Sequence, residues 1–335
     1  MAKKSTHEIL LTDALEDLKE QIPHKYHSII IQFVACYRQA LGSLFDEAIP
    51  NLLLFLQLTH MQFKSPYTFE PYHKKVRHPI DYYRFSMDFI SPLIDLPHSK
   101  VFGIEHLDDA ANALQQGENA ILLANHQTEP DPQVISILLE KTHPDIAEKI
   151  IYVAGERVVT DPLAIPFSMG CDLLCIFSKR YIDHPQELKT KKQLHNNNTM
   201  QQMGRLLQQG GRMIYVAPSG GRDRRNEQGI VEVAPFDPAS IEMFYLMAKK
   251  AKTPTRFLPF ALSTFDLFPP PETVQKELGE ARIAKRTPVF LSFAPPFDME
   301  SFSRSTGGNR VQKRENRARE IWAIVNRMYQ KMGTP

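Results

Sequence analysis

Residues 118–132 read ENAILLANHQTEPDP, a short apolar run that stops at a polar loop. A continuous run without alternating polar residues is typical of a strand buried on both faces, and such strands belong to parallel sheets covered by helices. Asn119–Ala124 is the first of six such runs in the chain. The others are Ile150–Ala154, Asp172–Phe177, Met213–Ala217, Arg256–Ala261 and Val289–Phe293.

Between and after the later runs, apolar residues recur at the spacing of three and four that marks one face of a helix. They do so in the segments 203–207, 241–248 and 321–328. Strand-like runs that alternate with helical segments indicate an α/β fold with a mixed, mostly parallel sheet flanked by helices. We expect residues 99–335 to form this larger domain.

Residues 1–98 have a different texture, because they contain a single glycine, Gly42, and four apolar sets at helical spacing. Prolines separate the sets, so we expect a small helical bundle as an N-terminal domain. Pro50 suits the first turn of the third helix. The sets are Leu11, Ala14, Leu15 and Leu18; Ile30, Phe33, Val34 and Tyr37; Ile49, Leu52, Leu53 and Leu56; and Tyr82, Phe85 and Phe89.

The composition argues against several classes of protein. Lys plus Arg number 40 against 38 Asp plus Glu in 335 residues, and a net charge of +2 gives no reason to expect a nucleic-acid partner. No uninterrupted apolar run approaches the ~18–20 residues that span a bilayer, so we expect at most peripheral membrane contact. The N-terminus has no apolar secretory core, and the three cysteines lack disulfide or zinc spacing. These features predict a reducing compartment and no metal site.

The loop after the first run carries His126 and, five residues later, Asp131. In open α/β sheets, ligands bind beyond the carboxyl ends of the strands, which is where this loop lies. A carboxylate that holds one ring N–H of a histidine fixes its tautomer and lets the other nitrogen act as a general base. Pro130 and Pro132 prevent a regular helix here, so the loop can fold back. The alternative is structural, with His126 capping the end of the strand and Asp131 capping a helix that starts at Pro132.

Cations follow three of the other runs, most densely in PSGGRDR, residues 218–224. Glycine allows a ligand to approach the backbone, and arginine presents a planar fork of donors that matches phosphate oxygens. A solvated basic turn is the alternative. A base and several cations at one sheet edge together predict a pocket for a phosphate-bearing substrate. The candidate binding residues are Arg157, Lys179, Arg180, Tyr181, Ser219, Gly220, Arg222 and Arg224.

Four blocks resemble the motifs of the glycerolipid acyltransferases in order and spacing, from about residue 100 to residue 300. They are NHQTEPDP (125–132), AGERV (154–158), APSGGRDR (217–224) and FLPFAL (257–262). Together with DPLAIPFSMG (161–170), their wording is most similar to the soluble plastid-type glycerol-3-phosphate acyltransferases. The helical N-terminal domain is a feature of that family too.

The resemblance implies that residues 99–335 form an acyltransferase catalytic domain. This family moves a fatty acyl group from a thioester, typically that of acyl carrier protein, to the sn-1 hydroxyl of glycerol 3-phosphate, with no metal or organic cofactor. His126 matches its catalytic histidine and Asp131 the carboxylate partner. The implied location is the cytoplasm of a bacterium, or the plastid stroma if a transit peptide has been removed.

The resemblance also implies a phosphate site. Arg222 and Arg224 match arginines that hold the substrate phosphate. Arg180 and Tyr181 stand where the family has a Lys-His pair, which leaves open which residue there contacts the phosphate, and Lys179 is the alternative.

Two clusters of basic residues suggest how the acyl donor is attracted. They steer an acidic carrier protein in a salt-dependent way, although anionic lipid or a solvated helix face would fit them as well, and a CoA thioester is the other possible donor. The clusters are Lys189, Lys191 and Lys192, and Arg304, Arg310, Lys313, Arg314, Arg317, Arg319, Arg327 and Lys331.

Two other functions stay open at this point. One is a lysophosphatidate acyltransferase that acts at the sn-2 position with acyl-CoA. The other is a non-catalytic anion-binding protein on the same fold, which would tolerate His126→Ala without loss of any activity.

Overall fold

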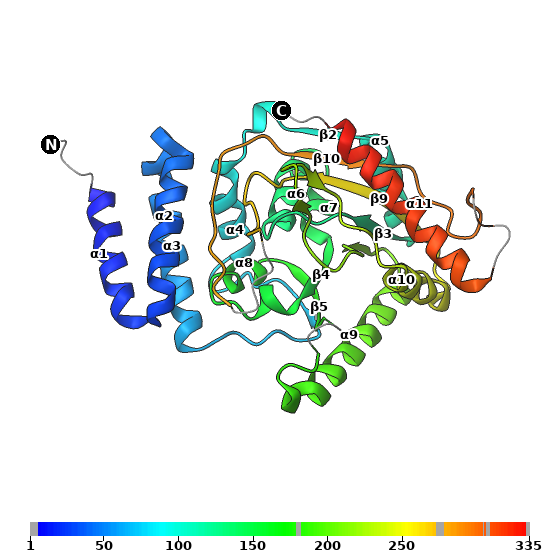
Figure 1. Cartoon of the computed structure of the whole chain (residues 1–335), viewed down its shortest axis with the longest axis horizontal. Helices are drawn as coiled ribbons and strands as arrows, with labels where there is room; N and C mark the ends of the chain where they lie inside the picture. The colour runs from blue at the N-terminus through cyan, green and yellow to red at the C-terminus, as the bar shows by residue number, and fades with distance from the viewer. Residues whose placement is uncertain (1–5, 179–181, 273–277, 304, 306–308, 333–335) are drawn as a thin grey trace.

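The computed structural model describes the chain except residues 1–5, 179–181, 273–277, 304, 306–308 and 333–335 (Figure 1). Its centre is an eight-stranded sheet in the order β1-β5-β4-β6-β3-β9-β10-β2. From β5 to β9 the neighbouring strands run parallel, β1 and β10 pair antiparallel with their inner neighbours, and β2 is parallel to β10. The strands are β1 (Tyr72–His73), β2 (Lys100–Phe102), β3 (Asn119–Ala124), β4 (Ile151–Gly155), β5 (Asp172–Ile176), β6 (Met213–Val216), β9 (Thr255–Ser263) and β10 (Phe290–Phe293).

The predicted fold class is confirmed, and all six predicted runs form strands whose ends lie within two residues of those expected. The sequence does not predict β1 and β2, because strands of two and three residues contain no apolar run. It also does not predict the small hairpin of β7 (Arg224–Arg225) and β8 (Val231–Glu232), which lies outside the main sheet.

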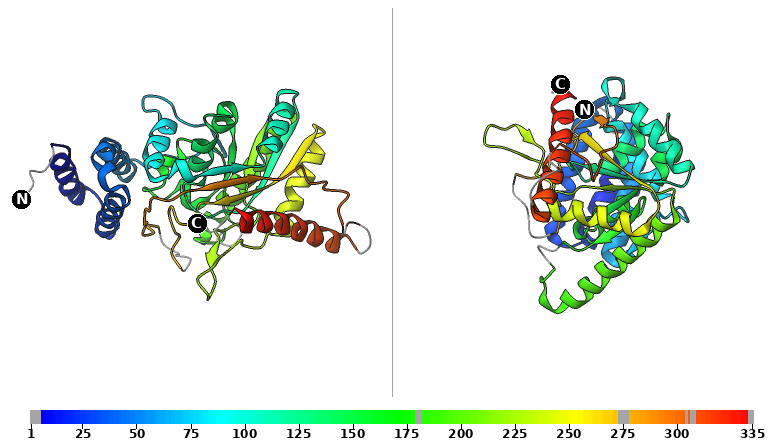
Figure 2. Two further views of the ribbon diagram at one scale, coloured as in Figure 1. Left: turned by 90° about the horizontal axis from the view of Figure 1, so that it is seen from above. Right: turned by 90° about the vertical axis from the view of Figure 1, so that its right-hand side faces the viewer.

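The central strand β3 divides the core into two layers. Ala120, Leu122 and Ala124 pack into one cluster of buried residues, whereas Ile121 and Leu123 pack into the other. Helices α4 to α7 contribute to the first cluster and α9 to α11 to the second, so helices cover both faces of the sheet (Figure 2). The helices are α4 (Tyr82–Ile90), α5 (Ile104–Gln115), α6 (Asp131–Leu139), α7 (Pro144–Lys149), α8 (Ile165–Ser168), α9 (Lys189–Gln209), α10 (Pro238–Ala251) and α11 (Arg310–Lys331).

The four helices expected in the N-terminal region are present as α1 (Thr6–Gln21), α2 (His27–Leu41), α3 (Phe45–Lys64) and α4. The expected start of α3 was wrong, because the helix begins at Phe45 and Pro50 lies inside it. A short turn at Gly42, with φ of +54°, reverses the chain and lets α3 start early. Pro50 therefore removes one backbone hydrogen bond from the helix.

Packing between the N-terminal helices and the rest of the chain is continuous. The Phe33 ring of α2 lies 6.2 Å from that of Phe89 and 6.1 Å from that of Phe268, and the Phe55 ring of α3 lies 5.7 Å from that of Phe167. These rings belong to or pack against the same cluster that covers one face of the sheet. The division at residues 98 and 99 remains a prediction about folding units.

By length and composition, one stretch of the described chain, His24–Lys64, would suffice to cross a membrane. It consists of two helices, α2 and α3, joined at Gly42. Both helices place buried residues in the core described above, and the core helix of a soluble protein passes the same test.

Candidate active site

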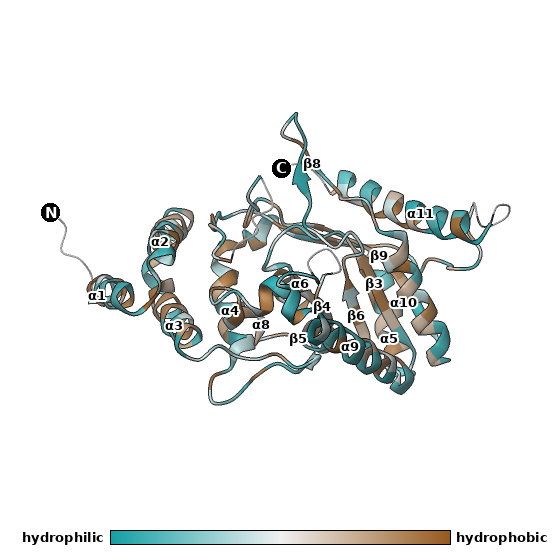
Figure 3. Ribbon diagram, turned by 60° about the horizontal axis from the view of Figure 1, so that its bottom comes forward, coloured by the Kyte–Doolittle hydropathy of each residue, from teal (hydrophilic) through white to brown (hydrophobic). Residues whose placement is uncertain are grey.

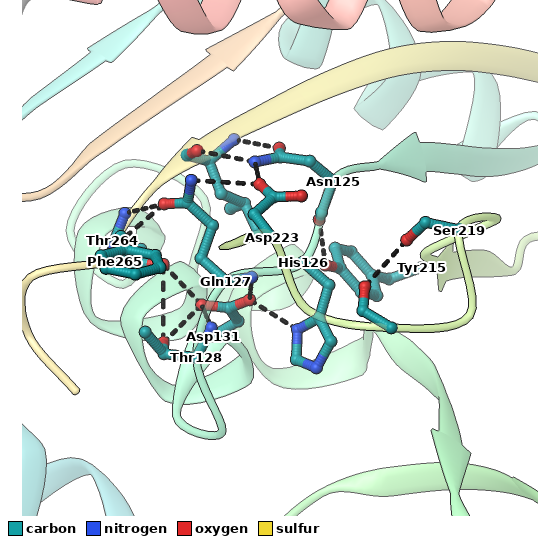
Figure 4. A network of polar contacts seen from close by, with 12 residues as sticks. Asn125, His126, Gln127, Thr128, Asp131, Tyr215, Ser219, Asp223, Thr264 and Phe265 are labelled. Atoms are coloured by element: carbon teal, nitrogen blue, oxygen red, sulfur yellow. Dashed lines mark hydrogen bonds and ion pairs between the residues drawn. The ribbon is translucent and has the colours of Figure 1, made fainter. Parts of the chain in front are cut away.

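The loop between β3 and α6 brings His126 and Asp131 together. Asp131 is the first residue of α6, and its Oδ2 lies 2.8 Å from His126 Nδ1 (Figure 4). The His126 side chain is 29% exposed, and within the described residues its Nε2 atom has no hydrogen-bond partner. The geometry therefore holds one ring nitrogen and leaves the other open to a substrate.

Asp131 is buried and hydrogen-bonded on every side. Besides the His126 contact, it accepts bonds from the Gln127 and Thr128 N–H groups at 2.9 and 3.2 Å, and from the Thr128 and Thr264 hydroxyls at 2.6 Å each. Burial alone would raise the pKa of Asp131, but the bond and charge of His126 and the two hydroxyls outweigh it and lower the pKa. An ionised Asp131 fixes a proton on Nδ1, so that Nε2 is the basic nitrogen.

The alternative reading of Asp131 as a cap of the following helix does not describe its contacts. The residue before α6 is Pro130, which makes no side-chain cap, and Asp131 bonds residues of the preceding loop. The prediction that Pro132 prevents a helix at this point is wrong. Helix α6 starts at Asp131, one residue before Pro132, and takes the proline into its first turn. The loop folds back before that helix begins.

The loop after β6 carries the arginines. Arg222 Nη2 lies 2.6 and 2.8 Å from the two carboxylate oxygens of Glu280, and the Arg157 guanidinium, which follows β4, contacts the same carboxylate at 2.5 Å. Glu280 is buried. Two cations predicted from separate loops therefore meet at one acidic residue that the sequence analysis missed.

Arg224 differs from its neighbours, because no carboxylate pairs with it in the part of the chain that the structure describes. Its Nη1 donates to the Asp223 carbonyl at 3.3 Å. Partial burial lowers the pKa of Arg224, and the positive charge of Arg222 lowers it further. A guanidinium in this setting is stabilised by an added anion.

Ser219 and Gly220 shape the turn before these arginines. Gly220 has φ of +66°, a left-handed conformation that favours glycine, and the Ser219 hydroxyl donates to the Gly221 carbonyl at 2.9 Å. Lys179, Arg180 and Tyr181 lie outside the described residues, so their predicted role stays a prediction.

Residues 280–283 line the arginine side of the site. Arg282 pairs with Glu129 at 2.7 Å and with Asp161 at 3.0 Å. These two carboxylates overcome the effect of burial and raise the pKa of Arg282 well above its ordinary value. The cavity beside Arg222, lined also by Glu280 and Arg282, has a volume of about 10 Å³, room for roughly one water molecule.

Two members of the predicted basic clusters are not on the surface. Arg317 is buried, donates to the Met299 carbonyl at 2.8 Å and pairs with Glu242. Lys192 is buried and its Nζ lies 2.9 Å from Glu156. The expectation that they attract a partner was therefore wrong, although helices α9 and α11 are otherwise largely hydrophilic (Figure 3). Arg304 lies outside the described residues.

Comparison with known proteins supplies the family. Residues 104–263 match the family model described as Acyltransferase. This segment, a little under half of the chain, is similar to the acyltransferase family. The chain is 39% identical over 286 residues to a chloroplastic glycerol-3-phosphate acyltransferase of Cucurbita moschata, 37% over 286 residues to one of Arabidopsis thaliana and 40% over 260 residues to one of Spinacia oleracea.

These alignments cover 85%, 85% and 77% of this chain but 64%, 62% and 55% of the respective relatives. The chain thus spans about three fifths of the length of the relatives it matches. The matched family segment runs from α5 through β9 and contains His126, Asp131, Arg222 and Arg224. The resemblance inferred from the four sequence blocks is confirmed.

Proposed function

We propose that this protein transfers a fatty acyl group from a thioester to the sn-1 hydroxyl of glycerol 3-phosphate. In this proposal His126 is the general base, and the loop after β6 that carries Arg222 and Arg224, here called the arginine loop, is the phosphate site. The observation that carries the proposal is the Asp223 N–H, which donates to the His126 carbonyl at 2.7 Å. Arg222 and Arg224 stand on either side of Asp223, so this bond brings them next to the loop of residues 125–131 that carries His126, here called the catalytic loop.

The proposed reaction follows from the two nitrogens of His126. An alcohol becomes a competent nucleophile when a base removes its proton during attack. Nε2 takes the proton of the acceptor hydroxyl, while Asp131 keeps the other proton on Nδ1 and stabilises the imidazolium. The oxygen attacks the thioester carbonyl, and the tetrahedral intermediate collapses to an ester and a thiolate, which recovers the proton from His126.

The arginine loop supplies position. A phosphate held by Arg224 and Arg222 fixes the acceptor hydroxyl near His126 and replaces a bimolecular encounter by an oriented one. Because the Arg222 guanidinium is already paired with Glu280, the phosphate either binds the same guanidinium alongside the Glu280 carboxylate or displaces that carboxylate. Arg157, which shares Glu280, is a further member of the proposed site, as are Ser219 and Gly220 in the turn.

The donor and location belong to the same proposal. We favour an acidic acyl carrier protein over CoA as the donor mainly because of the family resemblance, and basic residues of α11 would attract the carrier protein in a salt-dependent way. The relatives carry names that place them in chloroplasts, which supports the plastid stroma as the location, with the bacterial cytoplasm as the other setting.

The test is turnover by purified protein with glycerol 3-phosphate and either acyl carrier protein or CoA thioesters. We expect sn-1 acylation that His126→Ala reduces by about 10²–10⁴-fold, the usual contribution of a general base. His98→Ala is a matched control, because its Nδ1 lies 2.8 Å from Asp95 in an exposed pair. Acylation at sn-2, or unchanged turnover in His126→Ala, would overturn the proposal.

A further inference from the structure

The residue between the two phosphate-binding arginines points away from them, into the protein. Asp223 is fully buried, whereas the flanking Arg222 and Arg224 side chains retain some exposure. The Asp223 side chain is thus turned inward, between two arginines whose side chains reach the surface. Neither base catalysis nor phosphate binding, as described above, accounts for a buried carboxylate at this position.

Asp223 bonds three consecutive residues of the catalytic loop, with His126 in the middle. Its Oδ2 accepts from Asn125 Nδ2 at 2.8 Å and from Gln127 Nε2 at 3.1 Å, and its N–H donates to the His126 carbonyl at 2.7 Å (Figure 4). Its Oδ1 accepts from the Ala234 N–H at 2.9 Å. The Asp223 carboxylate therefore holds the side chains of the two residues that flank the base, and its backbone N–H holds the carbonyl of the base itself.

The two amides are fixed because each also reaches β9 or the turn after it. Asn125 Oδ1 accepts from the Leu262 N–H at 2.8 Å, and Gln127 Oε1 accepts from the Thr264 and Phe265 N–H groups at 2.7 and 2.9 Å. A carboxylate can only accept hydrogen bonds, so it requires both amides to turn their NH₂ groups toward it. Asp223 and the backbone N–H groups of residues 262, 264 and 265 together thus fix one orientation of the amides that tie the catalytic loop to β9.

We infer that Asp223 is a positioning residue, which locks the His126 loop to the Arg222–Arg224 loop so that base and anion site keep one geometry. The inference takes its reaction from the proposed function. Burial opposes an ionised carboxylate here and raises the pKa of Asp223 to about 6, although the bonds from Ala234, Asn125 and Gln127 work against that rise. Buried carboxylates with raised pKa values cluster at functional sites, and the geometry above gives this one a role there.

The test is Asp223→Asn, which preserves the shape of the side chain. Its NH₂ group must face either the Ala234 N–H or the amides of Asn125 and Gln127, so a donor meets a donor in either orientation. We expect kcat to fall by about 10- to 100-fold and the KM for glycerol 3-phosphate to rise, since small displacements at a site have effects of this size. Asn125→Ala should lower kcat with less change in KM, because Asn125 holds only the His126 side.

The matched control is Asn119→Ala. Asn119 is the first residue of β3, at the end of that strand opposite to the catalytic loop. Asn119 is fully buried, donates to the Leu207 carbonyl at 2.8 Å and accepts from the Arg212 N–H at 3.1 Å. The Asn119→Ala variant should have a lower free energy of unfolding than the wild type. Its kcat and KM should be near those of the wild type at temperatures below its unfolding transition. We also expect Asp223→Asn combined with Asn125→Ala to have a kcat close to that of Asp223→Asn alone.

Wild-type turnover separates the failure of this inference from failure of the proposed function. If the wild type acylates glycerol 3-phosphate and Asp223→Asn matches it in kcat and KM, the positioning role is wrong. A second readout needs no substrate: the ¹⁵N NMR signals of the His126 ring, assigned by their absence in His126→Ala. We expect these signals to shift or broaden in Asp223→Asn and to stay unchanged in Asn119→Ala, and unaltered signals in Asp223→Asn would contradict the inference.

Discussion

The His126 loop after β3 and the arginine loop after β6 lie side by side but are built differently. In the His126 loop, Asp131 has its partners within the loop and at the end of β9. In the arginine loop, Arg222 pairs with Glu280, 58 residues away in the chain, and Arg224 pairs with no carboxylate among the described residues. One loop is complete before a substrate arrives, whereas the other carries positive charge that an anion would balance.

The largest effect should come from breaking the completed loop with Asp131→Asn. An amide cannot accept from His126 and Gln127 on one side and from Thr128 and Thr264 on the other. We expect kcat to fall by about 10²–10⁴-fold in steady-state assays, because the histidine loses its fixed tautomer. Asp108→Asn, which breaks the outlying pair with His143, is the control and should leave kcat unchanged.

The next effect concerns the charged loop. Arg224→Ala should raise the KM for glycerol 3-phosphate by about 30-fold or more, equivalent to ~2 kcal/mol, with a smaller change in kcat. Arg225→Ala is the control, because the neighbouring Arg225 is exposed and pairs with Asp266 at 2.9 Å. Equal KM values for the two variants would show that position 224 does not bind the phosphate.

A smaller effect should follow from Glu280→Gln, which tests whether the protein's own carboxylate competes with the phosphate. The change leaves Arg222 and Arg157 without their shared acidic partner. We expect KM for glycerol 3-phosphate to fall by up to about fivefold, equivalent to ~1 kcal/mol, because the phosphate no longer competes with a charged carboxylate for Arg222. A higher KM would mean instead that Glu280 holds the arginines in their binding geometry.

The two buried carboxylates should give stability changes of opposite sign with pH. The pKa of Asp131 is lowered below 3.8, so its contribution to the free energy of unfolding is present above pH 3.8 and is lost as pH falls through the folded pKa. Burial raises the pKa of Asp223 from 3.8 to about 6, so the stability of the wild type relative to Asp223→Asn should decrease as pH rises from about 4 to 6. Urea unfolding of the wild type and both Asn variants from pH 3 to 7 measures both trends, and parallel curves would contradict them.

The sequence predicts those parts of the molecule that depend on local pattern. Buried parallel strands show as apolar runs, and the His126–Asp131 contact follows from a spacing that one loop can close. Thr264, Glu280 and Arg282 lie in segments without a repeating pattern, and only the folded chain brings them to the site. Asp223 lies between two arginines in the block APSGGRDR, and only the folded chain shows that its side chain turns inward.

Pro50 and Arg317 show two further limits of sequence reasoning. Pro50 fits a helix start by type, yet the turn at Gly42 decides where α3 begins. Arg317 belongs to a basic run by count, yet its position on the inner face of α11 buries it against Glu242. The first outcome depends on a local turn and the second on tertiary packing, and neither follows from residue type and spacing alone.

The central claim is that the imidazole of His126 and the guanidinium of Arg224 serve one substrate in different roles. Calorimetric titration of glycerol 3-phosphate into His126→Ala and Arg224→Ala tests it most directly. We predict that His126→Ala binds the acceptor with the affinity of the wild type and that Arg224→Ala binds it about 30-fold or more weakly. Loss of binding in His126→Ala, or wild-type binding in Arg224→Ala, would contradict the account.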